Sequence, residues 1–127
     1  MWLVKAVQVL TSDETCPELE IVDAGGTARA VLWPGVGALH RSIHVLTLAE
    51  ASATQVLCHP SDAVYYVSSG SAHVHDQSVG ISTEVGVGSM FHVDAGTSYS
   101  VVSTSSDTVI IGGPCPPDES LYEYLRY

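Results

Sequence analysis

The sequence predicts an all-β protein, a barrel or sandwich of short strands. Runs rich in Val, Ile, Thr and Tyr recur along the chain and are separated by clusters of Gly, Ser, Asp and Pro. This alternation is typical of strands joined by turns. No stretch of comparable length repeats its apolar residues at the helical period. The 127 residues, 46% of them apolar, can bury a core without disulfides, so we expect a single domain over residues 1–127.

Each expected strand is a β-rich run bounded by turn residues. We expect strands at about residues 2–8, 19–23, 28–32, 42–48, 54–59, 63–68, 72–75, 80–85, 90–93, 99–104 and 108–112. Pro114, Pro116 and Pro117 are expected to close the last strand, because proline cannot donate to a ladder. The tail, residues 118–127, is expected to form one or two helical turns with Asp118 as the cap.

The charge balance is strongly acidic. The chain has 14 Asp and Glu against 4 Lys and Arg, a formal net charge of −10. The bases Lys5, Arg29, Arg41 and Arg126 do not cluster. Nucleic acids and anionic membrane surfaces are bound through clustered Lys and Arg, so we expect neither as a partner.

The N-terminal run MWLVKAVQVL differs from a signal peptide. Lys5 splits the apolar run, no basic region precedes it, and no small-residue cleavage site follows it. The chain has no apolar stretch of about 18 residues, so no membrane-spanning helix is expected and we predict a cytoplasmic protein. Cys16, Cys58 and Cys115 lack metal-type spacing, and we expect reduced structural thiols.

Two segments carry an ordered pattern of histidine, glycine and aromatic residues. Residues 57–70 read LCHPSDAVYYVSSG, with His59 near the start and Gly70 at the end. Residues 88–99 read GSMFHVDAGTSY, opening on Gly88 and containing the turn Ala95-Gly96. Each pattern alone is moderately specific, and the two together at this separation are a strong signal.

These segments resemble the two signature motifs of the cupin superfamily. The first family motif is H-x-H, three or four residues, Glu, six residues and Gly. The second is Gly, five residues, P-x-G, two residues and His, with Asp94 here in place of Pro. The resemblance covers about residues 54–112. It implies a cupin jelly-roll β-barrel with an active site inside the barrel mouth and, by analogy with other single-domain cupins, a homodimer.

The resemblance also locates the family's metal ligands, three His and one Glu. Their positions here hold Leu57, His59, Ala63 and Tyr99, so only His59 is retained. Leu and Ala have no donor atoms, and a neutral phenol is a poor ligand for a divalent metal. Catalytic metal sites normally supply three protein ligands. We therefore expect no metal cofactor at this position.

A shifted metal site is the alternative. Asp62 precedes the replaced Glu position, and His44 lies on an earlier strand. If both turned inward, His44, His59 and Asp62 would form a two-His-one-carboxylate set for a divalent metal such as Fe, Mn, Ni or Zn.

A metal-free site would depend on polar side chains inside the barrel. His59 shares strand parity with Leu57 and is the expected general acid or base. Tyr99 is the expected hydrogen-bond donor to a carbonyl or enolate oxygen. For both residues, the alternative is a hydrogen-bonded core side chain without chemistry. The expected substrate contacts are Leu57, Ala63, Tyr65, His44 and Trp33. Packing without substrate contact is the alternative for the last three.

Three functions are open at this point. The first is a metal-independent enzyme that cyclises, isomerises or dehydrates a small apolar organic molecule of the secondary-metabolite kind, because proton movement and substrate folding suffice for those reactions. The second is a non-catalytic protein that binds a small ligand in the same cavity. The third is a metal-dependent oxygenase or lyase with the shifted site. We favour the first, since Leu57 and Ala63 make the former metal position apolar while His59 and Tyr99 leave two polar groups facing it.

Overall fold

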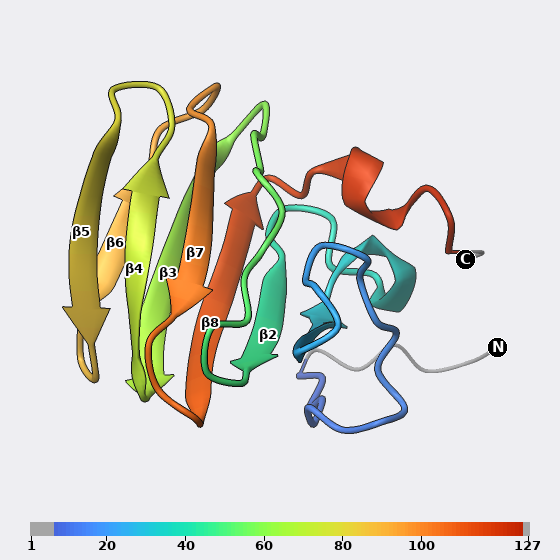
Figure 1. Cartoon of the computed structure of the whole chain (residues 1–127). Helices are drawn as coiled ribbons and strands as arrows, with labels where there is room; N and C mark the ends of the chain where they lie inside the picture. The colour runs from blue at the N-terminus through green and yellow to red at the C-terminus, as the bar shows by residue number, and fades with distance from the viewer. Residues whose placement is uncertain (1–6, 126–127) are drawn as a thin grey trace, which may run out of the picture.

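Two antiparallel sheets form a jelly roll in the computed structural model, which describes residues 7–125 (Figure 1). The five-stranded sheet has the order β1 (Gly26–Leu32), β2 (Ile43–Leu48), β8 (Thr108–Cys115), β3 (Asp62–Ser69), β6 (Met90–Val93). The three-stranded sheet has the order β5 (Ile81–Gly86), β4 (Ser71–Asp76), β7 (Tyr99–Ser103). Short 3-10 helices follow β1 (η1, Pro34–Val36) and β8 (η2, Glu119–Tyr122). The predicted all-β jelly roll is confirmed.

The core follows from the alternation of side chains along the strands. On β3, Ala63, Tyr65 and Val67 are buried, whereas Val64 and Tyr66 between them are exposed. Successive side chains of a strand point to opposite faces, so the buried set faces the barrel interior. Buried residues of the other strands complete the core: Ala28, Ala30, Leu46, Leu48, Ala72, Val85, Val93, Tyr99, Val101 and Ile110.

The segments before β1 and after β8 pack together beside the barrel. Leu19 N donates to Ala28 O at 2.7 Å and Ala30 N donates to Pro17 O at 2.9 Å, so the chain before β1 runs alongside that strand. From η2, the Tyr122 side chain is completely buried. Figure 1 shows both segments on the right, next to β2.

The opposite side of the barrel is bounded by two edge strands from different sheets. β5 ends the three-stranded sheet and β6 ends the five-stranded sheet. Residues 87–89 join them, and no ladder of hydrogen bonds pairs the two among residues 7–125. Figure 1 shows both strands on the left. The barrel is therefore open along the line between β5 and β6.

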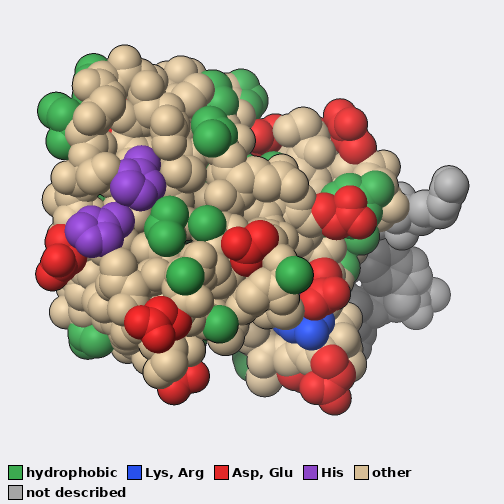
Figure 2. Space-filling view, viewed as in Figure 1, with side chains coloured by type: hydrophobic (Ala, Val, Ile, Leu, Met, Phe, Trp, Pro, Cys, Tyr) green, Lys and Arg blue, Asp and Glu red, His purple; other side chains and the backbone are tan. Residues whose placement is uncertain are grey.

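The charged side chains of the surface are mostly acidic, as the composition predicts. Figure 2 shows acidic side chains spread over the face that carries the three-stranded sheet, with Lys or Arg visible only at the lower right. The described chain holds two strong bases, Arg29 and Arg41. Arg29 Nη2 lies 3.7 Å from Glu18 Oε1.

The predicted strands between residues 28 and 112 are confirmed to within a few residues, except for 54–59. That segment and the predicted strand 19–23 are wrong as strands. They form isolated bridges only: Val22 with Thr54, Ala53 with Val102 and Leu57 with Tyr99. Because the partner of the segment changes every few residues, no continuous ladder develops. The predicted strand 2–8 lies outside the described residues, apart from Val7 and Gln8, which belong to no strand.

The end of β8 also differs from the prediction. Pro114 lies inside the strand, opposite Ala63, rather than closing it. Proline lacks only the donor, and its carbonyl still accepts from Ser42 N at 3.2 Å and from Ser42 Oγ at 2.6 Å. The predicted capping of the tail is confirmed, because the Asp118 side chain accepts from Ser120 N at the start of η2.

The three cysteines are free thiols, as expected, and Cys58 and Cys115 are exposed rather than part of the core. Within residues 7–125, none of the helices has the length and apolar character needed to cross a membrane.

Candidate active site

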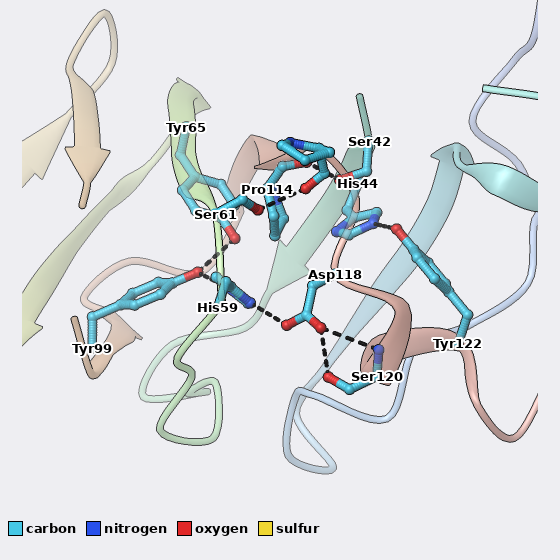
Figure 3. A network of polar contacts seen from close by, with 11 residues as sticks. Ser42, His44, His59, Ser61, Tyr65, Tyr99, Pro114, Asp118, Ser120 and Tyr122 are labelled. Carbon is cyan, nitrogen blue, oxygen red and sulfur yellow. Dashed lines mark hydrogen bonds and ion pairs between the residues drawn. The ribbon is translucent and has the colours of Figure 1, made fainter. Parts of the chain in front are cut away.

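Four buried polar residues form a continuous hydrogen-bonded chain inside the barrel (Figure 3). His59 lies at its centre, with Nδ1 2.8 Å from Asp118 Oδ2 and Nε2 2.7 Å from the Tyr99 hydroxyl. The Tyr65 hydroxyl lies 2.7 Å from that of Tyr99. The four residues are each at most 4% exposed. We call this group the Asp118–Tyr65 chain.

For a neutral His59 ring, counting protons gives the direction of these bonds. An ionised carboxylate only accepts, so His59 Nδ1–H donates to Asp118. A neutral imidazole carries one proton, so its Nε2 accepts the O–H of Tyr99. Tyr99 has then used its proton, and Tyr65 donates to the Tyr99 oxygen. Every donor points toward Asp118, which gives a proton taken up at Tyr99 a continuous route to His59.

Backbone pairing holds His59 and Tyr99 side by side. Leu57 N donates to Tyr99 O at 2.7 Å, and Tyr99 N donates to Leu57 O at 2.9 Å. Gly96 N donates to His59 O at 2.8 Å, which ties the turn before β7 to the segment that carries His59. Tyr65 enters from the inward face of β3. The two signature segments therefore bring the predicted pair, His59 and Tyr99, into direct contact.

Asp118 uses its two carboxylate oxygens for different partners. Oδ1 accepts from Ser120 N at 3.1 Å and from Ser120 Oγ at 2.7 Å, which caps η2. Oδ2 accepts from His59. Burial alone would raise the pKa of Asp118, but the hydrogen bonds from His59 and Ser120 outweigh it and hold the pKa below its ordinary value. The carboxylate is therefore ionised at neutral pH, and the cap and the site form together.

Burial keeps both tyrosines of the chain protonated. It raises the pKa of Tyr65 to about 12 and the pKa of Tyr99 far above its ordinary value. A free tyrosinate at Tyr99 is thus not available as a base. The hydroxyl instead acts as a donor, or as a relay that gives its own proton to His59 while it takes another.

A buried polar pair, His44 and Tyr122, lies beside the Asp118–Tyr65 chain (Figure 3). His44 Nε2 is 2.6 Å from the Tyr122 hydroxyl, and the Tyr122 ring packs on Trp33 with centroids 5.2 Å apart. Burial lowers the pKa of His44 to about 4, so the ring is neutral. Its Nδ1 is buried and has no hydrogen-bond partner among the described residues.

A cleft at the open edge between β5 and β6 extends inward past β4 and borders Tyr99, the one member of the Asp118–Tyr65 chain among its lining residues. Its inner hollow, of about 140 Å³, is lined by Tyr99, Phe91, Thr97 and the acidic Asp76 and Asp94, among others. Its outer hollow, of about 300 Å³, shares Phe91 and Asp76 and is otherwise mostly apolar, with Val79, Ile81, Val85 and Met90. The Phe91 ring stacks on Tyr65 with centroids 5.0 Å apart, so it separates the cleft from the far end of the Asp118–Tyr65 chain.

The residues at the family's metal position do not fit a metal. Leu57 and Ala63 are buried and carry no donor atoms. Both ring nitrogens of His59 are hydrogen-bonded, and the Tyr99 hydroxyl is shared between His59 and Tyr65. Since a catalytic metal takes about three protein ligands with available lone pairs, this donor set is inadequate.

The alternative set of His44, His59 and Asp62 is wrong. Both histidines are bonded to other side chains, and Asp62 points outward, with its side chain 57% exposed. Asp62 Oδ1 accepts from Ala95 N at 2.9 Å. Strand alternation is the reason: Ala63 faces inward, so its neighbour faces outward.

Asp62 instead belongs to a surface group with His92 and Asp94. His92 Nε2 lies 3.5 Å from Asp62 Oδ2, and His92 Nδ1 lies 3.4 Å from Asp94 Oδ1. The potential ligand atoms of these three exposed residues lie within 4.8 Å of one another, the one such group within residues 7–125. Its His92 and Asp94 line the same inner hollow as Tyr99.

The predicted site residues thus divide into two groups. Leu57, Ala63, Tyr65, His59 and Tyr99 surround the former metal position. His44 and Trp33 pack with Tyr122. Of these seven predicted residues, only Tyr99 lines the cleft, and the other six line neither of its hollows. The sequence did not indicate that Tyr122 and the second oxygen of Asp118 reach the barrel interior. The one available signal was that a cap uses a single carboxylate oxygen and leaves the other for a second partner.

Solved structures with the same architecture decide the fold. KdgF from Halomonas sp. matches with a TM-score of 0.72 at 14% identity, over 90% of this chain and 98% of that one. An RmlC-like cupin from Shewanella frigidimarina matches with a TM-score of 0.69 at 17% identity, over 90% and 96%. The chain has the cupin fold. A predicted oxalate decarboxylase from Thermotoga maritima also matches, with a TM-score of 0.67 at 18% identity, over 83% of this chain and 96% of that one.

No protein-family model matches the sequence of this chain, and no curated protein matches it. The resemblance of its two signature segments to the cupin motifs is confirmed by the fold. Identities of 14% to 18% establish architecture only, so the activity has to be argued from the site itself.

Proposed function

We propose that this cupin is a metal-independent enzyme that moves a proton on a small, largely apolar organic molecule bound in the cleft between β5 and β6. The observation that carries the proposal is the position of His59 between Asp118 and Tyr99. A carboxylate that orients an imidazole, which in turn contacts a hydroxyl, is the arrangement that makes a hydroxyl proton transferable.

The proposed step balances within the chain. The Tyr99 oxygen takes a proton from a substrate carbon or hydroxyl while its own proton passes to His59 Nε2. The electron pair stays on the substrate as an enolate-like anion, and Asp118 stabilises the imidazolium. Reversal returns the proton to the same atom or to another one. Cyclisation, isomerisation and dehydration are the reaction classes that this transfer serves.

The lining of the cleft supports an apolar substrate over a small dianion. Phe91, Val79, Ile81, Val85 and Met90 provide hydrocarbon surface. One similar structure is named as a predicted oxalate decarboxylase, and oxalate carries two negative charges. No Lys or Arg of residues 7–125 lines either hollow of this cleft, so a dianion would enter it without a counter-charge.

Hydrogen–deuterium exchange tests the proposal even while the natural substrate is unidentified. Small apolar ketones and enols would be incubated with the protein in D₂O, and exchange next to the carbonyl followed by proton NMR. We expect exchange in at least one bound compound, and a loss of about a hundredfold or more in Tyr99→Phe and His59→Gln. Tyr124→Phe and His40→Gln, at exposed positions outside the site, are the matched controls and should exchange normally.

A non-catalytic ligand-binding cupin is the second candidate. One observation favours it: the four polar groups of the Asp118–Tyr65 chain satisfy one another in the absence of substrate. This second function predicts that compounds bind in the cleft but exchange hydrogen for deuterium no faster than in buffer, with the wild type and with the variants. That result would reject the enzyme. The homodimer and the cytoplasmic location remain predictions from the sequence.

A further inference from the structure

The inner hollow of the cleft combines aromatic walls with carboxylates. Phe91 and Tyr99 contribute rings, and Asp76 and Asp94 contribute the charges. Asp76 is half-buried at the end of β4, where Oδ1 accepts from Ser78 N at 2.9 Å and caps the turn to β5. This leaves the second oxygen of Asp76, Oδ2, for another partner. Two acidic groups therefore border a recess that ends at a member of the Asp118–Tyr65 chain.

The same recess lacks a strong base among residues 7–125. That range holds two strong bases. Arg29 pairs with Glu18. Arg41 lines a separate hollow, with Ile43 and Val64, on the outer face of the five-stranded sheet. His92 is the one basic side chain that the described part of the chain contributes to the recess, and it contacts both Asp62 and Asp94. With a formal net charge of −10 on the chain, the potential at the cleft favours cations.

We propose that the cleft selects small organic cations: amines with an apolar body. This inference rests on the proposed function and names its substrate class. The ammonium group lies in the inner hollow, near Asp76 and Asp94 and against the Phe91 ring, where both the carboxylates and the aromatic face attract it. The apolar body extends into the outer hollow, where Val79, Ile81 and Met90 line the wall.

This placement sets which bonds react. Tyr99 lines the inner hollow and not the outer one. The atoms that it reaches are therefore those near the nitrogen, while the distal part of the molecule contributes binding only. A cation in this position also counteracts the negative charge that forms on the substrate when a proton leaves for Tyr99.

Three probes of similar shape separate charge from apolar contact: 2-phenylethylammonium, 2-phenylethanol and 3-phenylpropanoate. Affinities would be measured by NMR titration of the full chain at low and moderate salt. We expect the ammonium compound to bind about tenfold more tightly than the alcohol, with the carboxylate weakest. Added salt should weaken the binding of the ammonium compound but not that of the other two probes, because salt screens the partly exposed carboxylates.

Charge-neutral variants locate the effect. Asp76→Asn keeps the oxygen that caps the turn, and Asp94→Asn keeps the side-chain shape, so both should fold. The double variant should bind the ammonium compound no more tightly than the alcohol, with affinity for the alcohol unchanged. Glu84→Gln, an exposed change on β5 outside both hollows, is the matched control and should keep the preference.

The outcomes separate this inference from the proposed function. Equal affinity for the ammonium compound and the alcohol, or a preference that persists in the double variant, would overturn the selection of cations. Either result leaves proton exchange at Tyr99 untouched. Conversely, a cation preference that needs Asp76 and Asp94 in a protein without any exchange activity would support cation binding and reject the enzyme.

Discussion

The Tyr99 hydroxyl and His59 Nε2 lie 2.7 Å apart at the position where the sequence resemblance places the cupin metal. The other nitrogen of the same ring donates to Asp118. Histidines that bind metals are commonly oriented by such a carboxylate. The chain therefore keeps the arrangement that orients a ligand histidine, but the other ring nitrogen is hydrogen-bonded to a phenol hydroxyl.

The tautomer of His59 is the first prediction. Because Asp118 accepts from Nδ1, the neutral ring should carry its proton on Nδ1 and present a bare Nε2 to Tyr99. A long-range ¹H–¹⁵N correlation spectrum of ¹⁵N-labelled protein distinguishes the two nitrogens. Tyr99→Phe should shift the Nε2 signal most and leave Nδ1 protonated. A proton on Nε2 in the neutral ring would contradict the direction of the whole Asp118–Tyr65 chain.

Restoring the family's ligands should create a metal site. In the triple variant Leu57→His, Ala63→Glu and Tyr99→His, four ligands would converge, with His59 already oriented by Asp118. We expect near-stoichiometric Mn, Fe, Ni or Zn after incubation and dialysis, measured by elemental analysis. The same triple variant with His59→Gln added is the control, and it should bind less metal. Equal metal content in the unchanged protein would refute the proposal that the site works without a metal.

The charge of Asp118 should stabilise the fold in a pH-dependent manner. Its pKa in the folded protein lies below the ordinary value of 3.8, so the stabilisation is present above that value and is lost as the pH falls through the folded pKa. Asp118→Asn should cost about 1–3 kcal/mol at pH 7, because a buried donor loses its acceptor. The difference from wild type should narrow below pH 3.8.

Urea denaturation at pH 7, 5 and 3 would measure this effect. Asp107→Asn, at an exposed position, is the control and should match the wild type at each pH. A constant difference between Asp118→Asn and wild type from pH 7 to pH 3 would show that the charge of Asp118 is not responsible.

His44 should make the protein less stable in mild acid. Its folded pKa of about 4 lies below the ordinary value of 6.5, so the unfolded chain gains a proton between these values and the folded chain does not. The free energy of unfolding should fall by about 2 kcal/mol between pH 7 and pH 5 from this group. His44→Gln should lose that component, whereas His40→Gln should retain it. An unchanged slope in His44→Gln would disprove the assignment.

The sequence predicted the fold and half of the site because both depend on local pattern. Alternation at Ala63, Tyr65 and Val67 predicts which side chains face inward, and the two signature segments place His59 beside Tyr99. Such information extends over one strand or one hairpin. The error at residues 54–59 has the same origin, since a β-rich run shows strand character even where its partners change.

The contacts of Asp118 and Tyr122 could not be predicted from the sequence, because they depend on how a short tail folds back onto the barrel. Asp118 meets a histidine 59 positions away in the chain, and no periodicity reports a contact across that distance. Asp62 shows the converse. Its spacing in the first motif made it a candidate ligand, and only the register of β3 shows that it faces outward.

The position of Asp118 and Tyr122 also affects the order of events during synthesis. All eight strands of the described chain precede these two residues and so leave the ribosome first. A nascent barrel that closes early would bury His59 and His44 without their acceptor and hydroxyl partners, at a cost in free energy. Residues 118–122 end this condition when they emerge, so the hydrogen bonds of the barrel interior are completed only after all eight strands have been synthesised.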